Sequence, residues 1–189
     1  MGADPSMREE LIRRARVLFI DGYGLEGSLR AARIARDAEV PIVADFESAR
    51  DVRLNPLLEL VDHLIVPASF AQEWTGAANV EESLRMLWND SRQVVAVTAG
   101  SEGCWAMASG LAEAVHIPAH PVKVVDTLGC GDVFHGAYAA ALVFGYSVLG
   151  AIRFANVAAG LKAARLGTRE GLPTRAEIEV LLPIGDRRG

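Results

Sequence analysis

The amino-acid sequence predicts an α/β fold with a mostly parallel central sheet. Short apolar runs rich in valine and isoleucine alternate along the chain with amphipathic stretches, which is the pattern of repeated strand-helix-strand units. These runs are apolar at successive positions, as expected of strands that are covered on both faces. The chain has 189 residues, of which 51% are hydrophobic, so it can bury one substantial core. We therefore expect residues 1–189 to form a single α/β domain.

The predicted parallel strands are four short apolar runs, and the predicted helices are five longer stretches with helical periodicity or many small residues. The strands are Val17 to Ile20, Pro41 to Ala44, His63 to Val66 and Val94 to Thr98. The helices are Ser28 to Ala38, Asn79 to Trp88, Val133 to Phe144, Leu149 to Arg165 and Thr174 to Leu182. No internal repeat, low-complexity tract or linker-like stretch indicates a domain boundary.

The periodicity changes between residues 99 and 125. Two short alternating runs, Gly103 to Ala108 and Ala112 to Ile117, lie on either side of Ser109-Gly110, which is a hairpin signal. We expect an antiparallel excursion from the parallel sheet at this point.

The composition disfavours nucleic acid and membranes as partners. The net charge is −5, and the chain has no run of basic residues. The longest nearly uncharged stretch, Ala137 to Ile152, falls short of the roughly 20 apolar residues that a membrane span needs. Two cysteines, Cys104 and Cys130, are too few for a disulfide framework, and no targeting peptide is evident. We expect a cytoplasmic protein that acts on a small molecule.

The most informative segment is residues 126–132, which read Asp-Thr-Leu-Gly-Cys-Gly-Asp and precede a helix of small residues. The glycines allow backbone N–H groups to point into one concavity, and the first turn of the helix adds the positive end of its dipole. This arrangement suits a phosphate. An acidic residue there would repel a statically bound phosphate, but it could accept a proton from an attacking hydroxyl. The segment therefore predicts phosphoryl transfer, and an ordinary N-capped buried helix is the alternative.

This segment resembles the carboxy-terminal signature D-T-x-G-A-G-D of the ribokinase-like, or PfkB, carbohydrate kinase family. The resemblance implies a three-layer ribokinase-like sandwich and ATP- and Mg²⁺-dependent phosphorylation of a sugar or sugar-like hydroxyl. By this match Asp132 is the catalytic base, Gly129, Cys130 and Gly131 form the anion hole, and Thr127 belongs to the nucleotide site. The sequence has no P-loop motif G-x-x-x-x-G-K-[ST] that would bind the nucleotide in another way.

Cys130 stands where the family usually has alanine or another very small residue. Its position at a helix N-terminus could lower the pKa of the thiol and make it oxidisable. We favour the role of a small buried hydrophobic residue.

Three further segments extend the resemblance toward the nucleotide. Thr98 and Gly100 lie in a stretch that looks like the family's V-T-x-G-x-x-G turn against the nucleotide phosphates. Asn156 lies on the helix that matches the wall of the adenine site. Arg169 lies in the loop Gly167 to Thr174, which resembles the family's closing loop. That loop borders the nucleotide and, in several members, a monovalent cation.

Three residues are candidates for contact with the substrate. Asp21 and Tyr23 follow the first predicted strand, which the resemblance places on the substrate side of the sheet. His135 is three residues past Asp132, so its side chain projects from the same region of the helix. A buried or surface packing role is the alternative for this histidine.

The chain departs from the family pattern in two places. The family's N-x-x-E motif is absent after the strand that ends at Val66, so we assign no protein ligand to the metal, and Glu73 or Asp45 could act through water. The resemblance begins at about Val17 and lacks the amino-terminal substrate and lid portion. We therefore keep open a catalytically impaired kinase that binds a nucleotide or a partner protein. Apolar surface in place of the lid would favour association, for example as a homodimer.

An unrelated function also stays open, because Gly22, Gly24 and Gly27 form G-x-G-x-x-G after the first predicted strand. With Asp45 at the end of the next strand, this is a dinucleotide-binding fingerprint of NAD(P)-dependent oxidoreductases. Glu26 would lie where the pyrophosphate binds, which is electrostatically unfavourable. A tight strand-to-helix turn is the simpler interpretation of these glycines.

Overall fold

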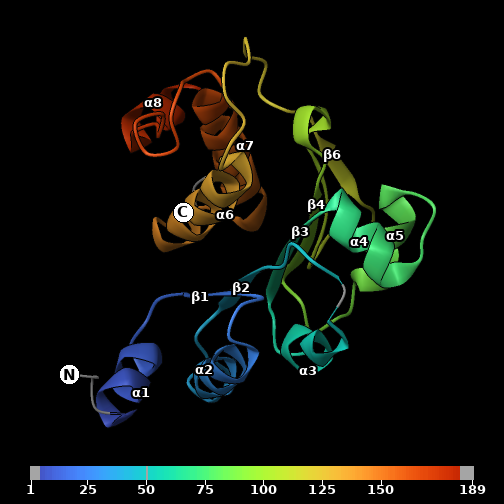
Figure 1. Cartoon of the computed structure of the whole chain (residues 1–189), viewed down its shortest axis with the longest axis vertical. Coiled ribbons are helices and arrows are strands. Elements are labelled where there is room, and N and C mark those ends of the chain that lie inside the picture. Colours follow the sequence, from blue (N-terminus) through green and yellow to red (C-terminus); the bar gives the residue numbers. More distant parts are fainter. Residues whose placement is uncertain (1–4, 50, 184–189) are drawn as a thin grey trace. The chain divides into compact units, whose positions relative to one another are not determined.

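The computed structural model describes residues 5–49 and 51–183. The chain forms two compact units, and most of their elements are labelled in Figure 1. The first unit consists of Met1–Thr98 and Trp105–Ala114, and the second consists of Ala99–Cys104 and Val115–Gly189. The assignment of residues 1–189 to a single domain stays a prediction.

The strands form a six-stranded sheet in the order β1-β2-β3-β4-β5-β6. They are β1 (Leu18–Asp21), β2 (Ile42–Asp45), β3 (His63–Pro67), β4 (Val94–Thr98), β5 (Cys104–Ala108) and β6 (Val115–Ile117). Neighbours from β1 to β4 pair in parallel, with Asp21 opposite Asp45 and Pro67 opposite Thr98. The α/β class and the mostly parallel sheet are thus confirmed, and the bounds of these four strands agree with the predicted ones to within one residue.

The antiparallel excursion is also present. The amide of Ala99 donates to Gly103 O at 2.8 Å, and that of Ser109 donates to Gln93 O at 3.0 Å, so β5 runs back along β4. Gly103 has a φ of 90°, and a Cβ at this position would lie 2.1 Å from Ile117 O. Both the backbone conformation and the close approach of a neighbouring carbonyl therefore require glycine here.

The first unit carries five α-helices among its described residues. They are α1 (Pro5–Arg13), α2 (Leu25–Asp37), α3 (Asn55–Leu58), α4 (Ala68–Thr75) and α5 (Val80–Leu87), with a 3₁₀ helix, η1, at Val52–Leu54. Alternate strand residues such as Ile20, Leu64 and Val97 form its core with Ala32 and Phe70. The prediction missed α1, α3 and α4, and it began α2 three residues too late.

The second unit contains α6 (Cys130–Val143), α7 (Val148–Ala163) and α8 (Arg175–Val180), with a 3₁₀ helix, η2, at Gly100–Glu102. Helix α6 packs against α7, and α7 packs against α8. Aromatic rings join their ends: the ring centroids of Tyr146 and Phe154 are 5.3 Å apart, and the Arg175 guanidinium lies 4.0 Å from the centroid of Phe144. In the part of the chain that the structure describes, no helix is both long and apolar enough to cross a membrane.

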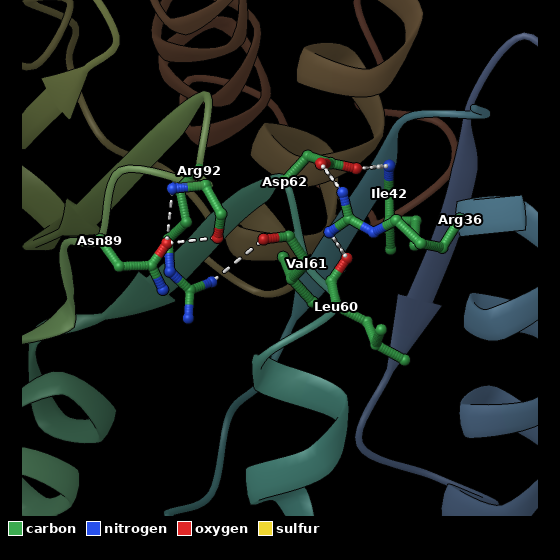
Figure 2. A network of polar contacts seen from close by, with 8 residues as sticks. Arg36, Ile42, Leu60, Val61, Asp62, Asn89 and Arg92 are labelled. Carbon is green, nitrogen blue, oxygen red and sulfur yellow. Dashed lines mark hydrogen bonds and ion pairs between the residues drawn. The ribbon is translucent and has the colours of Figure 1, made fainter.

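One carboxylate joins three elements of the first unit at the amino ends of its strands (Figure 2). Asp62, which precedes β3, accepts a hydrogen bond from the Ile42 amide at 2.9 Å and another from Arg36 of α2 at 3.0 Å. Beside it the buried Arg92 donates to Val61 O at 3.2 Å. Burial lowers the pKa of Arg92, and the nearby Asp62 opposes this effect. Asp62 therefore fixes β2 and α2 relative to β3.

The start of α6 depends on Gly129. This residue has φ 76° and ψ 10°, and the amide of Cys130 donates to Thr127 O at 3.1 Å. These values describe a type II turn with glycine at its third position, the position that needs a positive φ. The turn lets the helix begin at Cys130, three residues before the predicted start at Val133.

Replacing Asp62 with alanine should lower the free energy of unfolding by about 1–3 kcal/mol, because the buried Ile42 amide loses its side-chain acceptor. Urea denaturation followed by circular dichroism measures the change. Asp90→Ala is the matched control at an exposed aspartate and should change stability by less than about 0.5 kcal/mol. Equal effects of the two substitutions would contradict the role of Asp62.

Gly129→Ala should destabilise the protein by about 1–2 kcal/mol, because an L-residue is strained at this positive φ. Gly136→Ala is the matched control inside the same helix, where a Cβ meets nothing within 4 Å. The control should gain up to about 1 kcal/mol from the higher helix propensity of alanine. Thermal unfolding curves compare the two variants, and a shift of both in the same direction would refute the explanation.

Candidate active site

The carboxylate of Asp126 organises the turn before α6. Its Oδ1 accepts a hydrogen bond from the Leu128 amide and its Oδ2 one from the Gly167 amide, both at 3.0 Å. These two bonds, together with the Lys162 ammonium, lower the pKa of Asp126. The carboxylate is therefore ionised at neutral pH, and it connects the turn to the start of the loop at Gly167.

The free amides at the start of α6 differ from those expected. The resemblance implies an anion hole from Gly129, Cys130 and Gly131, but the Cys130 amide already donates to Thr127 O inside the turn. Within residues 128–132 of the described chain, the amides of Gly129, Gly131 and Asp132 donate to no protein acceptor. They lie at the positive end of the α6 dipole, so they can bind an anion.

Asp132 lies in the first turn of α6, exposed beside these amides. A Cβ on Gly129 would lie 3.7 Å from Asp132 Oδ2 and 3.6 Å from Thr168 Cγ2, so both side chains lie close to the turn. Asp132 also lines a pocket of about 500 Å³ between the three helices of the second unit and the loop before α8. The rest of the lining is mainly apolar: Val133, Ala137, Ala140, Phe144, Phe154, Ala158, Leu172, Pro173 and Ile178.

Cys130 is half-buried, and its thiol lies 3.9 Å from Asp126 O. Burial raises the pKa of this thiol, and the effect exceeds that of the nearby Lys162, which acts in the opposite direction. The alternative of a lowered pKa is therefore not found, because desolvation outweighs the charge of Lys162. The favoured role of a small buried hydrophobic residue agrees with this environment.

His135 lies inside the unit. Its side chain is 3% exposed, and its Nδ1 lies 2.8 Å from Gly131 O, so this nitrogen carries the proton and donates. This geometry favours support of the Gly131 peptide over direct contact with a substrate.

The segment of residues 118–126 lies along α7. The buried Asn156 amide donates to Pro118 O, and a Cβ on Gly160 would lie 2.9 Å from His120 Cβ. Glycine at position 160 thus permits the close approach of this segment. The side chain of Asn156 thus holds this segment against α7. The contact of Asn156 with the nucleotide stays a prediction.

The predicted closing loop is a compact turn. Gly167 has a φ of 90°, and its carbonyl accepts a hydrogen bond from the Gly171 amide at 3.1 Å. Arg169 is exposed at the tip of this turn. Its exposure is compatible with phosphate contact.

The candidates in the first unit lie at the carboxyl ends of its parallel strands, where α/β sheets bind ligands. Asp21 ends β1 and accepts a hydrogen bond from the Tyr23 amide at 2.9 Å, and the side chains of both residues are exposed. Asp45 is the register partner of Asp21, and Thr98 ends β4. Gly100 follows in the second unit with a φ of 56°.

Glu73 and Asp45, the two carboxylates that could contact Mg²⁺ through water, belong to no cluster of metal ligands in the described residues. Glu73 is exposed on α4, and Asp45 is half-buried at the end of β2. In the described residues, no group of three or more histidine, cysteine, aspartate or glutamate side chains is arranged to hold a metal ion.

The glycines of the dinucleotide fingerprint lack the contacts that such a site requires. Gly24 caps α2 with a φ of 62°, but a Cβ on Gly27 would meet nothing within 4 Å. In a dinucleotide-binding fold the third glycine permits close packing of helix and strand. The simpler interpretation, a tight turn into α2, accounts for these residues.

Sequence reasoning missed Lys162. Its side chain is completely buried in α7, and its ammonium contacts Asp126. A signal was present, because this is one of only two lysines in the chain and it follows a long run of small and apolar residues.

Known proteins resemble this chain along most of its length. The family model for pfkB family carbohydrate kinases matches residues 8–175. Ribokinase of Bacillus subtilis is 44% identical over 86 residues, which cover 46% of this chain and 29% of that protein. Fructokinase-1 of Oryza sativa subsp. japonica is 30% identical over 197 aligned positions, which cover 92% of this chain and 60% of that protein.

Solved structures of other proteins have a similar fold. Ribokinase of Arabidopsis thaliana, complexed with ribose and ATP, matches with a TM-score of 0.83 and 25% identity, over 96% of this chain and 59% of that one. Ribokinase of Giardia lamblia matches with a TM-score of 0.82 and 21% identity, over 95% of this chain and 64% of that one, and shows the shared fold. The chain thus spans less than two thirds of the length of these relatives. Since the family model matches most of its residues, the chain belongs to the pfkB family of carbohydrate kinases.

Proposed function

We propose that the chain carries the phosphoryl-transfer machinery of an ATP-dependent carbohydrate kinase, with Asp132 as the general base. The supporting observation is the position of this exposed carboxylate, in the first turn of α6 and beside free backbone amides. A proton acceptor and an anion-binding helix start are the two groups that transfer of a phosphoryl group to a hydroxyl needs.

In this proposal a sugar hydroxyl loses its proton to Asp132 as its oxygen attacks the γ-phosphorus of ATP, and the bond from that phosphorus to the β,γ-bridging oxygen breaks to release ADP. The amides of Gly129, Gly131 and Asp132 donate hydrogen bonds to the developing charge on the transferred group. Because Asp126 and the Thr127 carbonyl fix the turn beforehand, these donors need little reorganisation during the reaction. ATP with Mg²⁺ supplies the phosphoryl group and neutralises part of its charge.

The remaining candidates complete the nucleotide and substrate sites. Thr98, Gly100 and Arg169 would contact the phosphates, and Thr127 and Asn156 would lie near the nucleotide. Mg²⁺ would be held mainly by the phosphates and water, since this ion usually binds few protein carboxylates. The relatives include a ribokinase and a fructokinase, so we propose a sugar as the substrate, with Asp21 and Tyr23 as its candidate contacts.

A second candidate is a nucleotide-binding or partner-binding module without turnover. Exposed apolar side chains on the loops of the second unit, such as Leu128 and Leu166, would favour contact with a partner.

We also propose a homodimer and a cytoplasmic location. Large apolar side chains are exposed on the loops of the second unit, among them Leu128, Leu166 and Leu172. Such side chains favour association when they form a contiguous patch. Light scattering coupled to size-exclusion chromatography measures the mass in solution.

Asp132→Asn should lower kcat by about 10²–10⁴-fold while leaving the affinity for ATP–Mg²⁺ nearly unchanged, because the amide cannot accept the proton. A coupled ADP-release assay across a panel of sugars measures kcat, and thermal shift measures nucleotide binding. Asp37→Asn is the matched control, since it makes the same change at an exposed position of α2 in the first unit. Turnover of the Asp132 variant near that of the wild type would refute the assignment of the base.

The same measurements separate the candidate functions. A melting temperature that rises with ATP–Mg²⁺, without ADP release on any sugar, would support the binding module. A rise with NAD(H) or NADP(H) alone would support the oxidoreductase.

A further inference from the structure

A buried ammonium group lies beside Asp126. Lys162 projects from α7 with 0% of its side chain exposed, and its Nζ donates to the backbone O of Asp126 at 2.8 Å. The same Nζ lies 3.2 Å from Asp126 Oδ2. A charged amine is expensive to bury, so it requires an anionic partner with further hydrogen bonds, and Asp126 provides both.

The partner of this lysine connects two loops. Asp126 accepts the Leu128 amide at the start of the turn before α6, and it accepts the Gly167 amide at the start of the closing loop. The amides of Val125 and Asp126 also donate to Ala163 O, next to Lys162 in α7. The ammonium therefore lies where the turn before α6, the closing loop and α7 meet.

The resemblance to PfkB kinases implies a monovalent cation that borders the closing loop. At Asp126, which holds the start of that loop, the residues present do not fit one. Asp126 Oδ2 already has two partners, Oδ1 has one, and its backbone O accepts from the ammonium. A second cation beside Asp126 would lie close to the buried ammonium and would be repelled by it.

We propose that the Lys162 ammonium is a built-in cation that takes the place of a monovalent metal ion at this position. Lys162 is then a positioning residue: it acts through Asp126 on the turn that presents Gly129, Gly131 and Asp132. Its consequence for catalysis rests on the proposed kinase function, whereas its consequence for structure does not. The protein should accordingly be indifferent to the identity of the monovalent cation in solution.

Thermal shift of the full chain tests this proposal in KCl, NaCl, NH₄Cl and choline chloride at one ionic strength. The wild type should melt at the same temperature in all four salts. Lys162→Ala should melt about 5–10 °C lower in choline chloride, because it leaves the Asp126 charge without its partner. KCl or NH₄Cl should recover at least half of that loss, since a small cation can enter the vacated space and choline cannot.

Lys123→Ala is the matched control, because it removes the other lysine of the chain, which is exposed. It should melt like the wild type in every salt. If Lys162→Ala does not fold, Lys162→Met keeps most of the apolar stem, removes the charge, and should show the same rescue by KCl. A potassium-specific rise for the wild type, or a loss in the Lys162 variants that no cation reverses, would overturn the proposal.

An activity measurement adds the catalytic consequence. In the ADP-release assay, the wild-type kcat should be equal in KCl and choline chloride, and that of Lys162→Ala should rise about tenfold on addition of KCl. Activation of the wild type by potassium would overturn the proposal. Absence of turnover in every salt would refute the kinase function instead, and the melting temperatures would still decide whether Lys162 replaces a cation.

Discussion

The second unit depends on the ionic contact between Asp126 and Lys162. The carboxylate holds the turn before α6 through Leu128 and the following loop through Gly167, and the ammonium holds the carboxylate from α7. A helix start can bind an anion only if its amides are kept free of other acceptors and aimed in one direction. This contact fixes the turn before α6, and the amides of Gly129, Gly131 and Asp132 that follow have no protein acceptor among the described residues. The same buried charge that would destabilise an apolar helix therefore supports the proposed chemistry.

In the first unit, the two ends of the parallel strands carry carboxylates with different surroundings. At the amino ends, Asp62 is engaged by Ile42 and Arg36 and holds a strand and a helix in place. At the carboxyl ends, Asp21 is exposed and bonds its own turn, so it stays accessible to a ligand. Parallel strands bring all their carboxyl ends to one edge, which explains why residues distant in sequence can contribute to one site.

The elements that sequence patterns predicted well are those whose environment is uniform. Strands β2 to β4 are buried on both faces, so their apolar runs have nearly the same length as the strands. Helix α3 has only four residues and α4 has eight, and tertiary packing of Leu57 and Phe70 stabilises them more than a periodic pattern does. The start of α6 was misplaced because Gly129 and Gly131 read as a loop, whereas the second of them lies inside the helix.

The candidate site was partly predictable for a similar reason. The turn with Asp126, Gly129 and Asp132 is contiguous, so its residues could be recognised together. Lys162 could not be recognised in this way, because its partner Asp126 is 36 residues away in the sequence. The hydrogen bond from the Cys130 amide to Thr127 O could not be predicted either, because it depends on the backbone angles of the turn. Neither contact can be predicted from the spacing of neighbouring residues in the sequence.

The burial of Lys162 also has a practical consequence for chemical labelling. The chain has two lysines, and one of them is shielded from solvent and held by an aspartate. An amine-directed reagent applied to the folded protein therefore finds one accessible lysine side chain, that of Lys123. Lys123 lies between His120, which contacts α7 at Gly160, and Asp126. A fluorophore attached there would report on the segment that leads into the anion-binding turn, without the introduction of any new residue.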